Sequence, residues 1–173
     1  MSASILVAYA TKYGATRDMA ERIALILEQA GFRVQLSASE RVASVRQFDA
    51  VIIGSSIYHD NWLLEAEELL ESFHEQLAAK KVWLFSAGVT PELVGERQID
   101  DWLPGTLKSL AEHIKPQKTT LFAGKVDAET MKLDDWLVNP GLRQTSEDYR
   151  DWAIIEAWAR SIAETLSNVA TMN

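Results

Sequence analysis

The stretch SILVAYATKYGATRDMAERIALILEQAGF, residues 4–32, decides how the chain folds. Its residues 5–10 form an apolar run without polar alternation, which is typical of a parallel strand covered on both faces. Apolar residues then recur at the spacing of one helix face, at Ala20, Ile23, Ala24, Leu27 and Ala30. Because Gly31 follows where a left-handed helix cap belongs, the stretch predicts a strand, a turn and a helix.

The same alternation of strand and helix continues along the chain. Further strand patterns lie at residues 32–36, 50–54, 82–85 and 120–123. Further helical patterns lie at residues 66–77, 104–114 and 155–166. This order predicts a doubly wound α/β sheet. Two irregular stretches, 87–103 and 125–148, are longer than usual connections and are expected to be functional or flexible.

The composition narrows the classes of protein to consider. The chain has 173 residues, 47% of them hydrophobic, and we expect one domain over residues 1–173. Its net charge of -8 disfavours nucleic acid as a partner. The lack of cysteine excludes disulfides, thiolate metal sites and a cysteine nucleophile. No basic leader and no apolar run of the ~18 residues that a membrane span needs is present, so we expect a cytoplasmic protein without a transmembrane segment.

Three segments are predicted to lie at the carboxyl edge of the sheet, where open α/β sheets bind ligands. They are residues 11–16, 55–62 and 86–91, and each contains glycine or hydroxyl side chains. The first segment runs directly into a helix. The leading N–H groups and the dipole of such a helix form an anion site.

Thr11, Gly14 and Thr16 favour a phosphate as that anion. The two hydroxyls can donate hydrogen bonds, and the glycine lets the backbone curl around the ligand. The alternative is that Thr16 only caps the helix and Gly14 only serves the turn. Because neither GxxxxGK[ST] nor GxGxxG occurs, nucleotides bound through those motifs are disfavoured.

YATKYGATRDMAERIA, residues 9–24, resembles the phosphate loop and first helix of flavodoxin-like proteins, whose pattern Thr/Ser-x-Thr-Gly-x-Thr binds the phosphate of FMN. Thr11, Gly14 and Thr16 match the pattern, and Tyr13 replaces its middle threonine. FDAVIIGSSIYHDNW and KVWLFSAGVT resemble the family's other two flavin loops. The resemblance implies a three-layer α/β sandwich with helices on both faces of a five-stranded parallel sheet of order 2-1-3-4-5, and it implies FMN as the cofactor.

Within this family, the chain is similar to the flavodoxin-domain group that includes menaquinone-dependent protoporphyrinogen oxidase. The likeness lies in GSSIYH, residues 54–59, and in DYRDWAIIEAWARSIA, residues 148–163. That group carries a basic, aromatic stretch before its last helix, whereas residues 127–148 are acidic on balance here. The difference argues against quinone reduction and porphyrinogen oxidation and leaves the expectation of FMN binding unchanged.

The resemblance implies a role for each loop: the first holds the phosphate, the second meets the N5 side of the flavin, and the third lines its pyrimidine edge. The implied cofactor-binding residues are Thr11, Lys12, Tyr13, Gly14, Ala15, Thr16, Ser55, Ser56, Ile57, Tyr58, Ser86, Ala87, Gly88 and Val89. Tyr58 and Trp62 are candidates for stacking on the ring or for ordinary packing. His59 is a candidate proton donor to reduced flavin or a solvated loop histidine.

We therefore expect an FMN-binding electron-transfer protein or a flavin-dependent oxidoreductase, with a redox protein or a small molecule as acceptor. Whether the chain is an enzyme, and whether a homodimer holds the FMN, stay open. One competing hypothesis is a cofactor-free scaffold that acts through protein contacts. Another is a hydrolase using Ser55, Ser56 or Ser86, although no GxSxG elbow is present.

The helices away from these loops offer no spacing of histidine and acidic residues that indicates a metal site. We expect His74 and His113 to be surface residues. The acidic residues of segment 65–75 make either a docking face for a basic redox partner or an ordinary solvated face.

Overall fold

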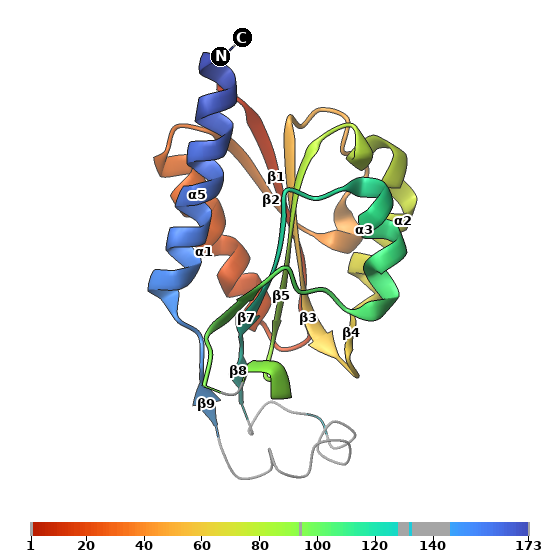
Figure 1. The fold of residues 1–173 in the computed structure, drawn as a ribbon, viewed down its shortest axis with the longest axis vertical. Helices are drawn as coiled ribbons and strands as arrows, with labels where there is room; N and C mark the ends of the chain where they lie inside the picture. Colours follow the sequence, from red (N-terminus) through yellow and green to blue (C-terminus); the bar gives the residue numbers. More distant parts are fainter. Residues whose placement is uncertain (1, 94, 128–131, 133–145, 173) are drawn as a thin grey trace.

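The computed structural model describes residues 2–93, 95–127, 132 and 146–172. A largely parallel sheet lies between two layers of helices (Figure 1). The strands are β1 (Ser4–Ala10), β2 (Arg33–Ala38), β3 (Ala50–Tyr58), β4 (Asn61–Trp62), β5 (Lys81–Gly88), β6 (Gln98–Asp100), β7 (Lys118–Ala123), β8 (Lys125–Val126) and β9 (Glu147–Asp148). The α-helices are α1 (Ala15–Gln29), α2 (Leu64–Ala78), α3 (Lys108–Ile114) and α5 (Trp152–Thr171), and the short 3-10 helices are η1 (Ser39–Arg41), η2 (Pro91–Leu93) and η3 (Gly105–Leu107).

The sheet confirms the expected strand order. Its path is β2-β1-β3-β5-β7-β6, and the five strands from β2 to β7 pair in parallel. Two additions are antiparallel: β6 extends the sheet beside β7, and β4 folds back on β3 as a hairpin. The order reverses between β1 and β3, so the switch point lies beside the loop that follows β1.

The two helical layers follow from the alternation of side chains along β1. Ile5 and Val7 face α1 and α5, while Leu6 and Ala8 face α2 and α3. Figure 1 shows α1 and α5 on one side of the sheet and the other two helices opposite them. Each strand at the centre is thereby buried on both faces, which explains its unbroken apolar sequence.

Helix α1 ends as the sequence predicts. Gly31 has φ of 94°, its N–H donates to the carbonyl of Glu28 at 2.9 Å, and the N–H of Phe32 donates to that of Leu27 at 3.2 Å. This pair of hydrogen bonds forms a Schellman motif, which requires the left-handed conformation that glycine adopts freely. The chain is thus turned directly into β2.

Three expectations need adjustment. Trp62 lies in β4 and is buried, because the chain first makes a hairpin before α2 begins at Leu64. Pro104 precedes a 3-10 turn, and α3 begins only at Lys108. The stretch 125–148 contains β8 and β9 at its ends, and its residues 128–131 and 133–145 lie outside the described part. In the described residues, no helix is both long and apolar enough to cross a membrane.

Candidate functional site

A cavity of about 150 Å³ opens at the carboxyl edge of the sheet, between the ends of β1, β3, β5 and β7. Most of its lining was predicted from the sequence: Lys12, Tyr13, Ala15, Thr16, Ser56, Ile57, Tyr58, Ala87, Gly88 and Val89. The structure thus brings the three predicted loops together at one place. It adds a fourth wall that sequence reasoning missed, formed by Gly124, Lys125, Val126 and Asp127.

The turn after β1 is shaped by its own side chains. The hydroxyl of Thr11 accepts a hydrogen bond from the N–H of Gly14 at 2.9 Å, and Gly14 adopts φ of 95° as the N-cap of α1. A residue with a Cβ would be strained in this conformation. The turn therefore leaves the first N–H groups of α1 directed out of the helix, where an anion can accept them.

Thr16 lies in the first turn of α1 and is fully buried. Its Oγ1 is 2.7 Å from the Oγ of Ser56 at the end of β3. The alternative that Thr16 caps the helix is wrong, because Gly14 occupies the N-cap position and no side chain caps it. The hydroxyl pair instead joins the first loop to the second across the cavity wall.

Ser55 and Ser86 are buried behind the cavity and do not line it. The hydroxyl of Ser55 donates to the carbonyl of Ser56 and accepts the N–H of Leu63, while Ser86 accepts the indole N–H of Trp62 at 2.8 Å. These bonds fix the β3–β4 hairpin against β5. They also weaken the hydrolase hypothesis, since neither hydroxyl bonds to a histidine.

Tyr58 lines the cavity, and Trp62 does not. Trp62 as a stacking partner is therefore wrong: its ring is in the core next to Ser86. The Nζ of Lys12 lies 3.3 Å from the centroid of the Tyr58 ring, so a cation covers that face. The ring of His59 packs edge-on against the ring of Tyr58, and the two ring centroids are 4.2 Å apart. His59 and Asp60 have φ of 49° and 61°, as a two-residue type I′ hairpin requires.

The fourth wall depends on a close approach of two backbones. The N–H of Gly124 donates to the carbonyl of Gly88 at 2.8 Å, and its own carbonyl accepts from Tyr149 at 3.0 Å. A Cβ on Gly124 would lie 3.1 Å from the backbone nitrogen of Gly88. Only glycine leaves the ends of β5 and β7 this close. A glycine directly after a predicted strand was the one available signal in the sequence.

Arg150 is another residue that sequence reasoning missed. Its side chain is only 6% exposed and pairs with Asp148 at 2.8 Å and with Asp18 of α1 at 3.2 Å. It also lies over the ring of Trp152. Hydrogen bonds from Arg150 lower the pKa of Asp148. The guanidinium therefore ties the end of β9 to the first turn of α1, next to the proposed phosphate loop.

A larger cavity of about 290 Å³ adjoins the first and shares Gly88 and Val89 with it. Its other described lining residues are Thr90, Leu93, Gly95, Glu96, Arg97, Ala123 and Tyr149. Arg97 donates to the carbonyl of Tyr149 at 3.2 Å. The carboxyl edge thus holds two chambers, separated by the segment that follows β5.

Comparison with known proteins agrees with this architecture. A family model described as a flavodoxin domain matches residues 6–136. No curated protein matches the chain in sequence. Among solved structures, a flavodoxin from the domain Archaea is 18% identical, with a TM-score of 0.60 over 95% of this chain and 99% of that one. The oxidised flavodoxin 2 of Bacillus cereus is 22% identical, with a TM-score of 0.56 over 90% and 98% of the two chains.

Rubredoxin oxygen:oxidoreductase from Desulfovibrio gigas is 14% identical, with a TM-score of 0.63. The match covers 95% of this chain and 36% of that much longer one. At these levels of identity, the structural likeness bears on the fold alone.

Proposed function

The chain belongs to the flavodoxin domain family, and we propose that it is an FMN-dependent oxidoreductase whose acceptor approaches the flavin through the larger cavity. FMN is the cofactor of this family, and electron transfer is its general function. When bound, FMN supplies the transfer of one or two electrons at its N5 edge.

The residues around the smaller cavity fit FMN. The turn at Gly14 presents helix N–H groups to a dianionic phosphate without needing several basic side chains. Ile57, Val89 and Val126 offer apolar walls for a flat ring. The hydroxyl pair of Thr16 and Ser56 holds the phosphate wall and the ring wall at a fixed separation.

The adjoining cavity is the observation that favours an oxidoreductase over a pure electron carrier. It reaches the proposed flavin edge at Gly88 and Val89. Segment 86–91 contains no aromatic residue to cover the ring there. A small acceptor in this chamber would contact the side chain of Arg97, whose positive charge favours an anionic molecule.

The decisive experiment is a visible spectrum followed by anaerobic reduction. We expect the protein to bind added FMN with quenching of flavin fluorescence, and the reduced protein to be reoxidised by a small anionic acceptor with saturation kinetics. A strictly linear dependence on the concentration of that acceptor, together with fast reoxidation by a redox protein, would instead indicate a carrier. A protein that stays colourless and leaves FMN fluorescence unchanged would support the scaffold hypothesis.

The proposal does not extend to porphyrinogen oxidation. The stretch 127–148, where the oxidase group has its basic aromatic segment, is acidic on balance. Residues 128–131 and 133–145 of that stretch lie outside the described part of the chain. A cytoplasmic location and exchange of electrons with a redox partner protein are further parts of the proposal.

A further inference from the structure

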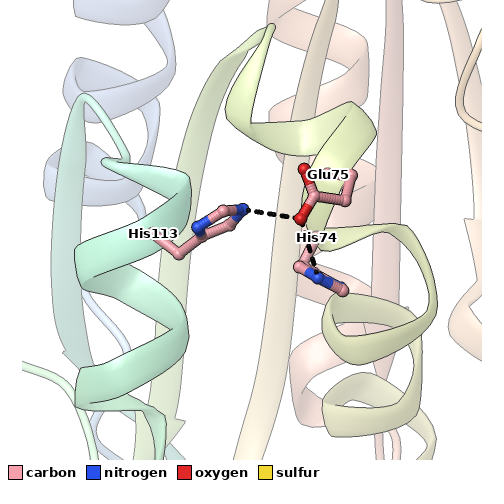
Figure 2. Close-up of side chains that lie close together, drawn as sticks. All are labelled: His74, Glu75 and His113. Atoms are coloured by element: carbon pink, nitrogen blue, oxygen red, sulfur yellow. Dashed lines mark ion pairs between the residues drawn. The ribbon is translucent and has the colours of Figure 1, made fainter.

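Three side chains from two helices converge on the face of the molecule formed by α2 and α3 (Figure 2). His74 and Glu75 lie near the end of α2, and His113 lies near the end of α3. The Nε2 of His74 is 3.2 Å from Oε1 of Glu75, and the Nε2 of His113 is 3.4 Å from the same oxygen. The ligand atoms of all three residues lie within 4.8 Å of one another.

We propose that His74, Glu75 and His113 bind a divalent transition-metal ion, with Zn²⁺ as the best fit. Zn²⁺ takes imidazole nitrogen and carboxylate oxygen at about 2.0–2.1 Å in a tetrahedron, so neighbouring ligand atoms lie about 3.3 Å apart. The two distances to the carboxylate oxygen match that edge. Three protein ligands leave the fourth position for water.

The orientation of His74 supports a metal rather than a chance contact. Its Nδ1 is 2.6 Å from the carbonyl oxygen of Glu71, and because a carbonyl only accepts, Nδ1 carries the hydrogen. The lone pair of a neutral ring is then on Nε2, which points at the carboxylate of Glu75. A metal ion bound between Nε2 and the carboxylate would make this contact favourable, as a proton on Nε2 does. A backbone carbonyl that fixes the ring in this way is a regular partner of metal-binding histidines.

Accessibility and charge also suit a metal from solution. The side chains of His74, Glu75 and His113 are 42%, 73% and 46% exposed, so an ion can reach all three. Helix α2 carries further glutamates that attract divalent cations to this face. The two imidazoles select Zn²⁺, Ni²⁺ or Cu²⁺ over Mg²⁺ and Ca²⁺, which prefer oxygen ligands.

The site is separate from the flavin cavity. Helix α2 starts beside the β3–β4 hairpin and runs back along the sheet, so its last turns lie toward the opposite edge. A bound ion would join α2 to α3, two helices that are far apart in sequence. It would therefore stabilise the packing of α3, a helix of only 7 residues, without touching the redox site.

The test is a calorimetric titration of untagged, EDTA-treated protein with ZnCl₂. We expect binding of one Zn²⁺ per chain, an affinity at least tenfold weaker in H113Q and in H74Q, and no competition from a large excess of Mg²⁺. H59Q removes the histidine outside the cluster, and E68Q removes an exposed glutamate from the same helix. Both controls should bind Zn²⁺ as the unaltered chain does.

Thermal unfolding gives a second readout. Zn²⁺ at about 100 times its dissociation constant should raise the melting temperature of the unaltered chain by several degrees and leave H113Q unchanged, because only the folded state holds the two helices together. Equal Zn²⁺ affinity in the double variant H74Q/H113Q, equal competition by Mg²⁺, or no Zn²⁺ binding at all would each overturn the proposal. Circular dichroism confirms that the variants fold, and their FMN titration is expected to be unaffected.

Discussion

The two ends of the proposed flavin site are built in different ways. After β1, the turn is local, because Thr11 bonds to Gly14 three residues later and Gly14 starts α1. After β5 and β7, the wall is formed by Gly88 and Gly124, whose backbones meet only through strand pairing. The local end has a recognisable phosphate-loop motif, whereas Gly124 at the distant end belongs to no motif. The first end is therefore anchored by a local sequence pattern, and the second is shaped by strand pairing.

Gly124→Ala should have the largest effect. Its Cβ would lie 3.1–3.3 Å from three backbone atoms of Gly88, and a backbone held between paired strands cannot yield as a flexible side chain does. We expect a loss of about 2–3 kcal/mol in the free energy of unfolding, the upper range for overpacking, together with weaker FMN binding. Urea unfolding and FMN titration measure the two effects.

Gly105→Ala is the matched control for that substitution. A methyl group on Gly105 would meet no atom within 4 Å, and the residue has no positive φ, so the change should be neutral or slightly stabilising. If Gly124→Ala behaved like this control, the close approach of β5 and β7 would not shape the site, and the distinction between its two ends would fail.

Arg150→Leu tests the link between the ends, since Arg150 joins β9 to the first turn of α1. We expect a loss of about 2 kcal/mol, below the usual value for a broken buried pair, because the two aspartates are about 40% exposed and can be rehydrated. Arg160→Leu removes an exposed arginine paired with Glu156 and should cost far less. Equal losses in the two variants would show that burial of Arg150 contributes nothing.

The same arginine gives a pH dependence. Hydrogen bonds from Arg150 lower the pKa of Asp148 in the folded chain. The stabilisation is therefore present above the unfolded-state pKa, about 3.9, and is lost as the pH falls through the lower folded-state pKa. Arg150→Leu should flatten the fall in stability below about pH 4, measured by urea unfolding at several pH values. An unchanged slope would contradict the pairing.

The same contrast explains how much the sequence could predict. The alternation of strands and helices and the turn after β1 follow from apolar runs, helical spacing and Gly14, which are all local signals, whereas the strand order was implied by the resemblance to flavodoxin-like proteins. The sequence left Trp62 open between stacking on a ligand and packing in the core, because an aromatic residue after a strand looks alike in both cases. The pairing of Arg150 with Asp18 and the meeting of His74 with His113 bring together residues that are far apart in the sequence. No spacing rule contains that information.

Thr16→Ala tests the local end directly. Loss of the buried hydroxyl that bonds to Ser56 should weaken FMN affinity by about 0.5–1.5 kcal/mol, the net value of a hydrogen bond between neutral groups. Thr16→Ser keeps the hydroxyl and should retain most of the affinity. Thr165→Ala, on the exposed face of α5, is the control for the loss of a threonine. Unchanged FMN fluorescence titration in Thr16→Ala would remove the hydroxyl from the site.

Lys12→Gln should have the smallest effect and asks whether the turn binds phosphate by charge or by backbone groups. Lys12 covers the ring of Tyr58, so its removal takes away one positive charge and also uncovers an aromatic face. The two changes oppose each other, so we expect the affinity for FMN to change by less than about 0.5 kcal/mol. Titrations at low and high salt should show a weaker salt dependence than in the unaltered chain. A loss larger than that of Thr16→Ala would mean that the charge of Lys12 holds the phosphate. The affinity of the local end would then come from charge and not from the geometry of the turn.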